Sequence, residues 1–90
     1  NSEEYNFGSE RELESIGDYL MEKSRFDDAI EVFKHNAKLF PKSGNVFLNL
    51  AEAFYKKGDQ KEALVNYKTS LSLDPLNKTA KEMVLKLEKK

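Results

Sequence analysis

An offset of 34 residues relates two parts of this chain and limits the folds that it can adopt. Apolar, aromatic and small residues recur at this offset, and so does proline. The pairs are Leu13 and Phe47, Ile16 and Leu50, Gly17 and Ala51, Leu20 and Phe54, Ala29 and Ala63, Phe33 and Tyr67, Leu39 and Leu73, and Pro41 and Pro75. A fixed period of this kind indicates stacked repeats, because one unit alone cannot cover its apolar face.

Within each unit the apolar residues are spaced three or four positions apart, which is the period of an α-helix. The periodic segments are interrupted at residues 24–25, at Pro41, at Gly58 and at Pro75. A proline disfavours helix in the residue before it, and a glycine can end a helix in the left-handed conformation. We therefore predict an all-α protein with five helices, at about residues 10–23, 26–40, 44–57, 60–73 and 77–88.

Polar residues at the starts of these segments have the pattern of helix N-caps. Residues 9–12 and 59–62 fit the capping box, in which a short polar side chain bonds the amide three residues further on. Asn77 is predicted to cap the fifth helix, although the residues after it also fit the glycosylation sequon. Ser24 is predicted to cap the second helix.

Each helix is expected to bury one stripe of side chains. The expected stripes are Leu13, Ile16 and Leu20; Ala29, Ile30, Phe33 and Ala37; Phe47, Leu50, Ala51 and Phe54; Ala63, Leu64, Tyr67 and Leu71; and Ala80, Val84 and Leu87. A glycine inside a helix costs about 1 kcal/mol relative to alanine, so Gly17 implies the close approach of a neighbouring helix. We expect Ala63 to be enclosed, and Asn36 to be at least half buried with its amide hydrogen-bonded.

These residue types and spacings resemble the tetratricopeptide repeat family. The family's pattern is a large apolar residue, a Leu-Gly or Leu-Ala pair, an aromatic residue, a small Ala, a second aromatic residue and a closing Pro. Residues 44–77 carry it as Phe47, Leu50-Ala51, Phe54, Ala63, Tyr67 and Pro75, and residues 10–43 as Leu13, Ile16-Gly17, Leu20, Ala29, Phe33 and Pro41. The chain departs from the pattern at Asn36 and Ser70, where the family usually has Ala. The resemblance covers about three quarters of the chain and implies a right-handed superhelical stack of antiparallel helix pairs, an α-solenoid.

The chain then divides into four parts. These are a flexible leader at residues 1–9, a first repeat at 10–43, a second repeat at 44–77 and a C-terminal capping helix at 78–90. Two interpretations of the leader stay open: a disordered tail, or a segment whose Tyr5 or Phe7 covers the first helix. Because the chain begins with Asn1 rather than Met, we also expect it to be a processed or excised piece of a longer protein.

The two ends of such a stack differ in their cover. Repeats stabilise one another at nearest-neighbour interfaces, and the fifth helix covers one end. The first helix has only residues 1–8 beside it. We therefore expect a monomer of marginal stability whose weaker end is the N-terminal one, with Tyr19 exposed unless the leader packs on it.

Composition argues against several classes of function. A net charge of −1 does not suit a nucleic-acid-binding protein, which needs a basic surface. No apolar run approaches the roughly 20 residues that cross a membrane, and no signal peptide is visible. We expect a soluble protein with neither a nucleic-acid nor a membrane partner, and the compartment stays unassigned. Residues 1–42 hold six basic and ten acidic side chains, and residues 43–90 hold nine and six. Solvated helix faces explain this asymmetry, and a weak head-to-tail attraction is the alternative.

No pattern of a catalytic site is present in the sequence. The chain has no cysteine and a single histidine, His35, which lies off the apolar stripe of its helix. Asp27 and Asp28 suit the start of a helix, where carboxylates favour the dipole. There is no nucleophile elbow and no glycine-rich phosphate loop. We therefore expect no enzyme activity, no metal and no cofactor.

The resemblance instead implies binding of a protein or peptide in a concave groove lined by the first helix of each pair. Carried over by register, the groove residues are Glu14, Asp18, Met21, Asn45, Leu48, Asn49, Glu52, Tyr55 and Lys56, flanked by Arg11, Ser15, Glu22, Glu82, Met83 and Lys86. One subset of the family binds a C-terminal carboxylate with Lys, Asn and Arg. The matching positions here are Glu14, Asp18, Asn49, Thr79 and Met83, of which only Asn49 fits. Glu14 and Asp18 would repel a carboxylate.

Three functional hypotheses remain open. In the first, the chain is a protein-interaction module. In the second, it is a structural or regulatory appendage of a parent domain in the same polypeptide, for example a bacterial enzyme, and has no peptide ligand of its own. The third hypothesis is a weak homo-oligomer that associates through the ends of the repeats.

Overall fold

Five α-helices make up the computed structural model, which describes residues 9–89 of the chain. The helices are α1 (Glu10–Glu22), α2 (Phe26–Leu39), α3 (Gly44–Lys57), α4 (Gln60–Leu73) and α5 (Lys78–Glu88). No β-strand occurs among these residues, so the all-α prediction is confirmed, and each predicted helix end lies within one residue of the observed one. The two interpretations of Tyr5 and Phe7 concern residues outside the described part of the chain.

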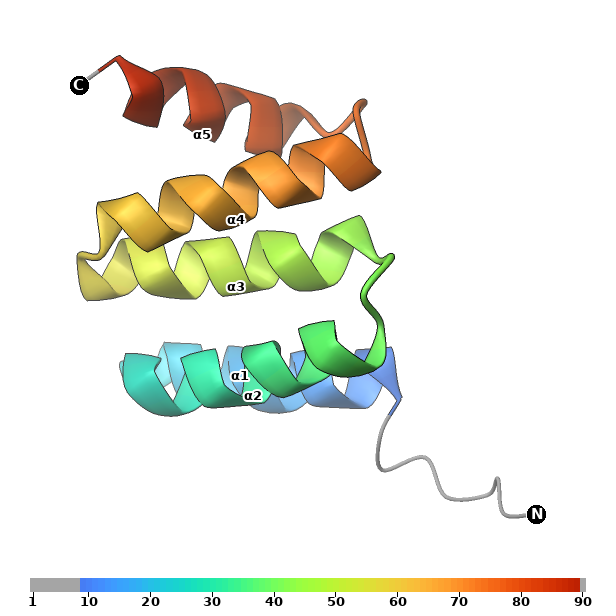
Figure 1. Cartoon of the computed structure of the whole chain (residues 1–90). Coiled ribbons are helices and arrows are strands. Elements are labelled where there is room, and N and C mark those ends of the chain that lie inside the picture. The colour runs from blue at the N-terminus through green and yellow to red at the C-terminus, as the bar shows by residue number, and fades with distance from the viewer. Residues whose placement is uncertain (1–8, 90) are drawn as a thin grey trace.

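The helices are arranged in space in the order of the chain. Each helix packs against the next one, and α1 also contacts α3. In Figure 1, α1 and α2 lie together at one end of the molecule, α3 and α4 follow, and α5 covers the other end. The core joins Ala29, Ile30, Phe33, Leu50, Ala51, Ala53, Phe54, Ala63, Tyr67, Val84 and Leu87. Four of the five helices therefore share one core, and Leu20 and Met21 of α1 pack against it.

Small residues let neighbouring helices approach closely. A Cβ atom added to Gly17 of α1 would lie 2.1 Å from Cε1 of Phe33 of α2, and Phe33 is 1% exposed. The close approach that the sequence predicted at Gly17 is therefore present. Ala63 and its counterpart Ala29 are both completely buried, which confirms that Ala63 is enclosed.

Three helix starts have the predicted caps. The Ser9 hydroxyl accepts a hydrogen bond from the amide of Glu12 at 3.1 Å, and a carboxylate oxygen of Asp59 accepts one from Glu62 at 3.1 Å. The side-chain oxygen of Asn77 accepts one from Ala80 at 2.8 Å. Each bond satisfies an amide that has no partner inside its own helix.

The prediction that Ser24 caps α2 is wrong. The N-cap residue of α2 is Arg25, and its side chain makes no capping hydrogen bond. Ser24 instead closes α1: it has a φ of 60°, and its amide bonds the carbonyl of Met21 while that of Arg25 bonds Leu20. Gly58 does the same after α3, with a φ of 101°. Ser24 thus takes the left-handed position that its repeat counterpart fills with glycine.

Two buried polar side chains, at positions related by the repeat, each join the two helices of one pair. The Asn36 amide nitrogen donates to the carbonyl of Glu10 at 3.1 Å, and the Ser70 hydroxyl donates to the carbonyl of Gly44 at 2.8 Å. Both side chains are completely buried. The prediction for Asn36 is confirmed, and the two departures from the repeat pattern make the same bond to the first residue of the preceding helix.

Five residues of the expected stripes are less buried than the sequence indicated: Ile16, Leu20, Phe47, Leu64 and Leu71. Ile16 is 49% exposed, because α1 packs against α2 and α3 and this side chain faces neither. Phe47 is half-buried, whereas Val46 beside it is completely buried. Because α3 has neighbours on two sides, it buries a second stripe that contains Val46 and Ala53. Leu64 and Leu71 are also half-buried, packed against the core.

Across residues 9–89, none of the helices combines the length and the apolar character that membrane crossing requires.

Candidate functional site

Four of the predicted groove residues come together in one pocket. Met21 of α1 and Glu52, Tyr55 and Lys56 of α3 line it, and the pocket has a volume of about 300 Å³. Its other lining residues are Tyr67 of α4 and Thr79 and Met83 of α5. We call this site the α1–α3–α5 pocket. Met21 and Tyr55 are counterparts at the repeat offset, so the stacking of equivalent helices brings them to one place.

The floor of the α1–α3–α5 pocket is apolar. Met21, Tyr55 and Met83 are half-buried and pack against the core, and Tyr67 is 2% exposed. Burial, together with nearby Glu52 and Tyr55, raises the pKa of Tyr67 above its ordinary value, so its hydroxyl stays neutral. Methionine side chains adapt to ligands of different shapes, which suits an exposed apolar pocket.

Charges of opposite sign flank the pocket. Burial raises the pKa of Glu52, nearby Asp18 raises it further, and Lys56 offsets part of the effect. Burial also raises the pKa of Asp18, together with repulsion from Glu14 and Glu22 on the same helix. On the other side, the Lys86 ammonium donates to the Tyr55 hydroxyl at 3.0 Å and lies 5.4 Å from the centre of that ring. The ionised forms of the Asp18 carboxyl on α1 and the Glu52 carboxyl on α3 are thus disfavoured.

The remaining predicted residues lie elsewhere on the same face. The Asn45 amide donates to a carboxylate oxygen of Glu14 at 3.2 Å, and both residues line a second pocket of about 320 Å³ with Glu10 and Arg11. This pocket is at the N-terminal ends of α1 and α3, whereas the α1–α3–α5 pocket is toward their C-terminal ends. The nine predicted residues therefore do not form a single pocket.

Leu48 and Asn49 lie between the ends of α3. Leu48 is half-buried and packs against the core. The Asn49 amide nitrogen is buried and has no hydrogen-bond partner, so this residue has an unsatisfied donor next to the groove face. Such a group costs free energy until a partner reaches it.

Sequence reasoning missed Tyr67 and Thr79 as lining residues. The sequence predicts Tyr67 as part of the buried stripe of α4, and only its burial beneath the pocket shows that it also forms the floor. The sequence places Thr79 only among the positions that match carboxylate-binding residues. The repeat offset carried a usable signal, because Thr79 is the counterpart of Asn45.

The described residues contain no group of three or more histidine, aspartate or glutamate side chains that could hold a metal ion. The single histidine, His35, is exposed on α2, as the sequence predicted.

The arrangement at the α1–α3–α5 pocket suits the binding of a side chain that is partly apolar and partly cationic. The sequence matches no protein-family model, and no curated protein is significantly similar to it.

Replacing Glu52 by glutamine should raise the free energy of unfolding at neutral pH by about 0.5 kcal/mol. The folded-state pKa of Glu52 lies above its ordinary value of 4.5, so between these two values the folded chain binds more protons than the unfolded one. The free energy of unfolding therefore falls as the pH rises through that interval, and the loss persists above it. Glutamine removes the loss.

Urea unfolding at pH 4 and at pH 7 checks this prediction. The difference between Glu52→Gln and the parent should be present at pH 7 and smaller at pH 4. Glu31→Gln, at an exposed position of α2, changes the net charge equally and serves as the control. A Glu52→Gln variant that is less stable than the parent at pH 7 would show that the Glu52 carboxylate has a stabilising partner.

Proposed function

We propose that this chain is a tetratricopeptide-like repeat module without enzyme activity that binds a peptide or a partner segment along α1, α3 and α5. The observation that carries the proposal is the α1–α3–α5 pocket. Apart from Tyr67 of α4, its lining residues come from the helices that begin three successive units, which is where a repeat of this kind exposes its concave face. An extended segment that follows this face would pass Glu14 and Asn45 at one end and Tyr55 and Met83 at the other.

Features repeated at the same offset support the assignment to this kind of repeat. The helix ends at Ser24 and Gly58 have the same hydrogen bonds, and Asn36 and Ser70 make the same bond to a preceding helix. The successive packing of α1 to α5 is that of a stack in which each helix pair contacts its neighbours. A right-handed superhelix is part of the proposal.

The chemistry of the α1–α3–α5 pocket indicates the class of ligand. Met21, Tyr55 and Met83 provide an apolar surface, and the ionised form of Glu52, which lines the pocket, is destabilised, as is that of nearby Asp18 outside the lining. A cationic side chain placed beside these two carboxylates would offset that destabilisation. The ligand we propose is therefore a protein segment in which a large apolar residue stands close to a lysine or an arginine.

The proposal of a non-catalytic role rests on the same lining. The described pocket residues with ionisable side chains are Glu52, Tyr55, Lys56 and Tyr67. The described lining contains no serine, histidine or cysteine. Thr79, its one threonine, has no histidine beside it, because His35 lies on α2 away from this lining.

Selection of short random peptides displayed on phage tests this function. Peptides enriched on the parent chain should combine a large apolar residue with lysine or arginine, and fluorescence titration should show saturable binding. Tyr55→Ser and Met83→Ser should each raise the dissociation constant by about tenfold or more, because they remove apolar contact at the centre of the site. Leu85→Ser is the matched control on α5, since Leu85 is 54% exposed and does not line the pocket.

Three results would contradict the proposal. Enrichment of acidic peptides would show that the carboxylates do not determine the ligand. Binding that survives both pocket substitutions but is lost in Leu85→Ser would place the site on the other face of α5. A chain that enriches no peptide would support the hypothesis of an appendage without a peptide ligand.

A further inference from the structure

The outer side of α1 is the one face of a repeat that lacks its usual neighbour within the described residues. Val46, Leu50 and Ala53 of α3 are 0%, 5% and 0% exposed. Their counterparts at the repeat offset are Glu12, Ile16 and Tyr19 of α1, and these are exposed, Ile16 by 49% and Tyr19 by 59%. Both helices have a following helix to pack on, but only α3 has a preceding pair. The residues that differ in burial are therefore those that face a preceding pair.

The other end of the stack behaves as expected for a finished end. Ala80, Val84 and Leu87 of α5 are buried, and they are the counterparts of Val46, Leu50 and Ala53. Lys81, Leu85 and Glu88, each one residue after a member of this buried stripe, lie about 100° further round α5 and are exposed, and two of the three are charged. A polar outer face is what a terminal helix needs to remain soluble. The outer side of α1 instead exposes two neighbouring large side chains, Ile16 and Tyr19, at its centre.

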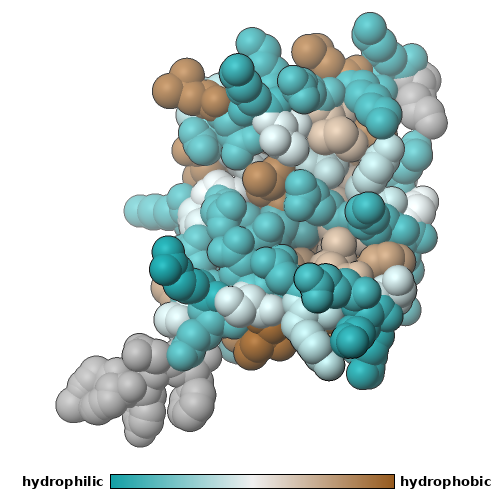
Figure 2. All heavy atoms as spheres, turned by 180° about the vertical axis from the view of Figure 1, so that it is seen from behind, coloured by the Kyte–Doolittle hydropathy of each residue, from teal (hydrophilic) through white to brown (hydrophobic). Residues whose placement is uncertain are grey.

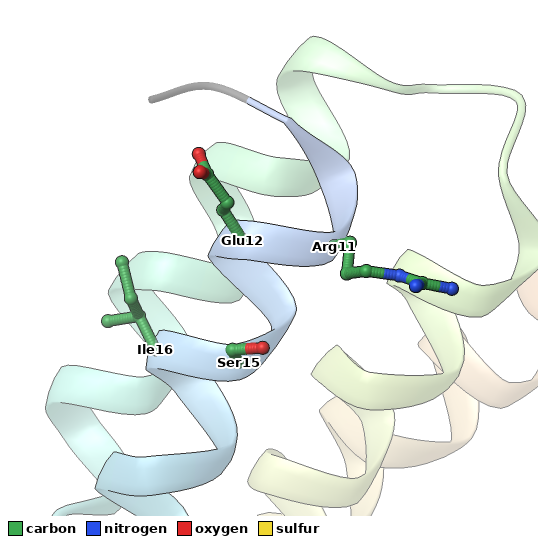
Figure 3. Close-up of a pocket in the computed structure, with 4 residues that line it drawn as sticks. All are labelled: Arg11, Glu12, Ser15 and Ile16. Atoms are coloured by element: carbon green, nitrogen blue, oxygen red, sulfur yellow. The ribbon is translucent and has the colours of Figure 1, made fainter. Parts of the chain in front are cut away.

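Four residues form a continuous stripe on the outer side of α1, which we call the α1 stripe: Glu12, Ile16, Tyr19 and Lys23. Their spacing of four, three and four positions places them on one face of a helix. Figure 3 shows Glu12 and Ile16 projecting from the same side of α1, with Arg11 directed elsewhere. Glu12 and Ile16 also line a pocket of about 530 Å³ together with Arg11 and Ser15. In Figure 2, hydrophobic side chains reach the surface at the lower edge of the molecule, where α1 and α2 form its end.

The α1 stripe is complementary to itself when it is reversed. It has a carboxylate at one end, two apolar side chains in the middle and an ammonium group at the other end. An antiparallel pairing about a twofold axis between Ile16 and Tyr19 would place Glu12 opposite the partner's Lys23 and Ile16 opposite the partner's Tyr19. Lys23 already lies 5.4 Å from the centre of the Tyr19 ring in the single chain, so its charge is next to the apolar part.

We infer that the α1 stripe binds the α1 stripe of a second copy of this chain, in an antiparallel, twofold-symmetric dimer. Such an interface is self-complementary, so one stripe supplies both sides of it. It fills the position that a preceding helix pair would occupy, and it covers Ile16 and Tyr19. The pairing leaves Tyr55 and Met83 out of the contact, because they belong to the α1–α3–α5 pocket on other helices.

Sedimentation equilibrium of the full chain over a range of concentrations tests the inference. The parent should show a reversible equilibrium between monomer and dimer. Ile16→Asp should raise the dissociation constant by about tenfold or more, because it places like charges at the centre of the contact. Leu85→Asp introduces the same charge at a similarly exposed position of α5 and should leave the equilibrium unchanged.

Charge reversal gives a second measurement that does not depend on the apolar residues. Glu12→Lys and Lys23→Glu should each weaken the dimer by about three- to tenfold, since each change makes two pairs repulsive. The double variant with both changes should recover the affinity of the parent. Circular dichroism of each variant should show the helical content of the parent. Failure of the double variant to recover would contradict the antiparallel pairing.

Other occupants of the α1 stripe would give other results. If the parent is monomeric and a Tyr5→Ser, Phe7→Ser double variant dimerises, residues 1–8 of the same chain cover the stripe and the inference is wrong. If Leu85→Asp weakens the dimer, the contact joins α1 to α5 in a head-to-tail manner. A parent that stays monomeric up to millimolar concentration, with or without Tyr5 and Phe7, also overturns the inference.

Discussion

Replacing Phe33 by alanine is expected to lower the free energy of unfolding by about 3–5 kcal/mol. The ring is 1% exposed and belongs to the core that the helices share. It also fills the space above Gly17, where no side chain of α1 exists to take its place. The loss therefore combines the burial of an aromatic ring with a cavity that neighbouring atoms cannot close. For a domain of this size, this is a large part of a total stability of about 5–15 kcal/mol.

Urea unfolding followed by circular dichroism measures this loss. Leu39→Ala is the matched control, because Leu39 lies on the same helix but is 45% exposed. Its loss should be about 1 kcal/mol or less. If the two variants lose equal stability, then the Phe33 ring is not the centre of the contact between α1 and α2. If Phe33→Ala is unfolded without urea, Phe33→Leu gives a smaller loss that can be measured against the same control.

Replacing Gly17 by leucine is expected to lower the free energy of unfolding by about 2 kcal/mol. The added Cβ atom alone would be 2.1 Å from Cε1 and 2.4 Å from Cζ of Phe33, so either the ring or the α1 backbone must move. The ring is 1% exposed, so a shift of the ring would have to displace neighbouring side chains. Leucine favours helix more than glycine does, by roughly 0.8 kcal/mol, so the clash costs more than the net change shows.

The double variant of Gly17→Leu with Phe33→Ala separates this clash from other causes. The new leucine would occupy the space that the missing ring leaves, so the double variant should lose less stability than the two single variants together. We expect a coupling energy of about 1–2 kcal/mol, within the range measured for residues in direct contact. Additive losses would contradict the packing of Phe33 over Gly17. Ser15→Leu, at an exposed position of α1, controls for helix propensity.

Local chemistry was sufficient to predict the helices and most of their ends. Helices end near Pro41, Pro75 and Gly58 because of the backbone preferences of proline and glycine themselves. The N-caps of α4 and α5 are Asp59 and Asn77, whose side chains reach an amide three residues away. The prediction that Ser24 caps α2 was wrong because serine is a common N-cap residue, and local sequence favoured that role. Only the backbone conformation shows that Ser24 closes the preceding helix.

The candidate site was predictable in part. The repeat offset assigned Met21, Glu52, Tyr55 and Lys56 to one face, and they do line one pocket. The offset could not show that four of the nine predicted residues line this pocket, two line another and three line neither, because that depends on which side chains reach across from neighbouring helices. It also could not assign Tyr67 to the floor, since a fully buried residue and a pocket floor have the same sequence pattern.

The sequence by itself determined that this chain is helical, where the helices begin and end, and which positions repeat. These properties follow from the helical period, the caps and the offset of 34 residues, all of which act locally or between equivalent positions. Only the tertiary structure decided the burial of Ile16 and Leu50, which occupy the same repeat position yet are 49% and 5% exposed. Their difference arises because burial depends on a neighbouring helix: α3 has α2 beside it, and α1 has no preceding helix among the described residues.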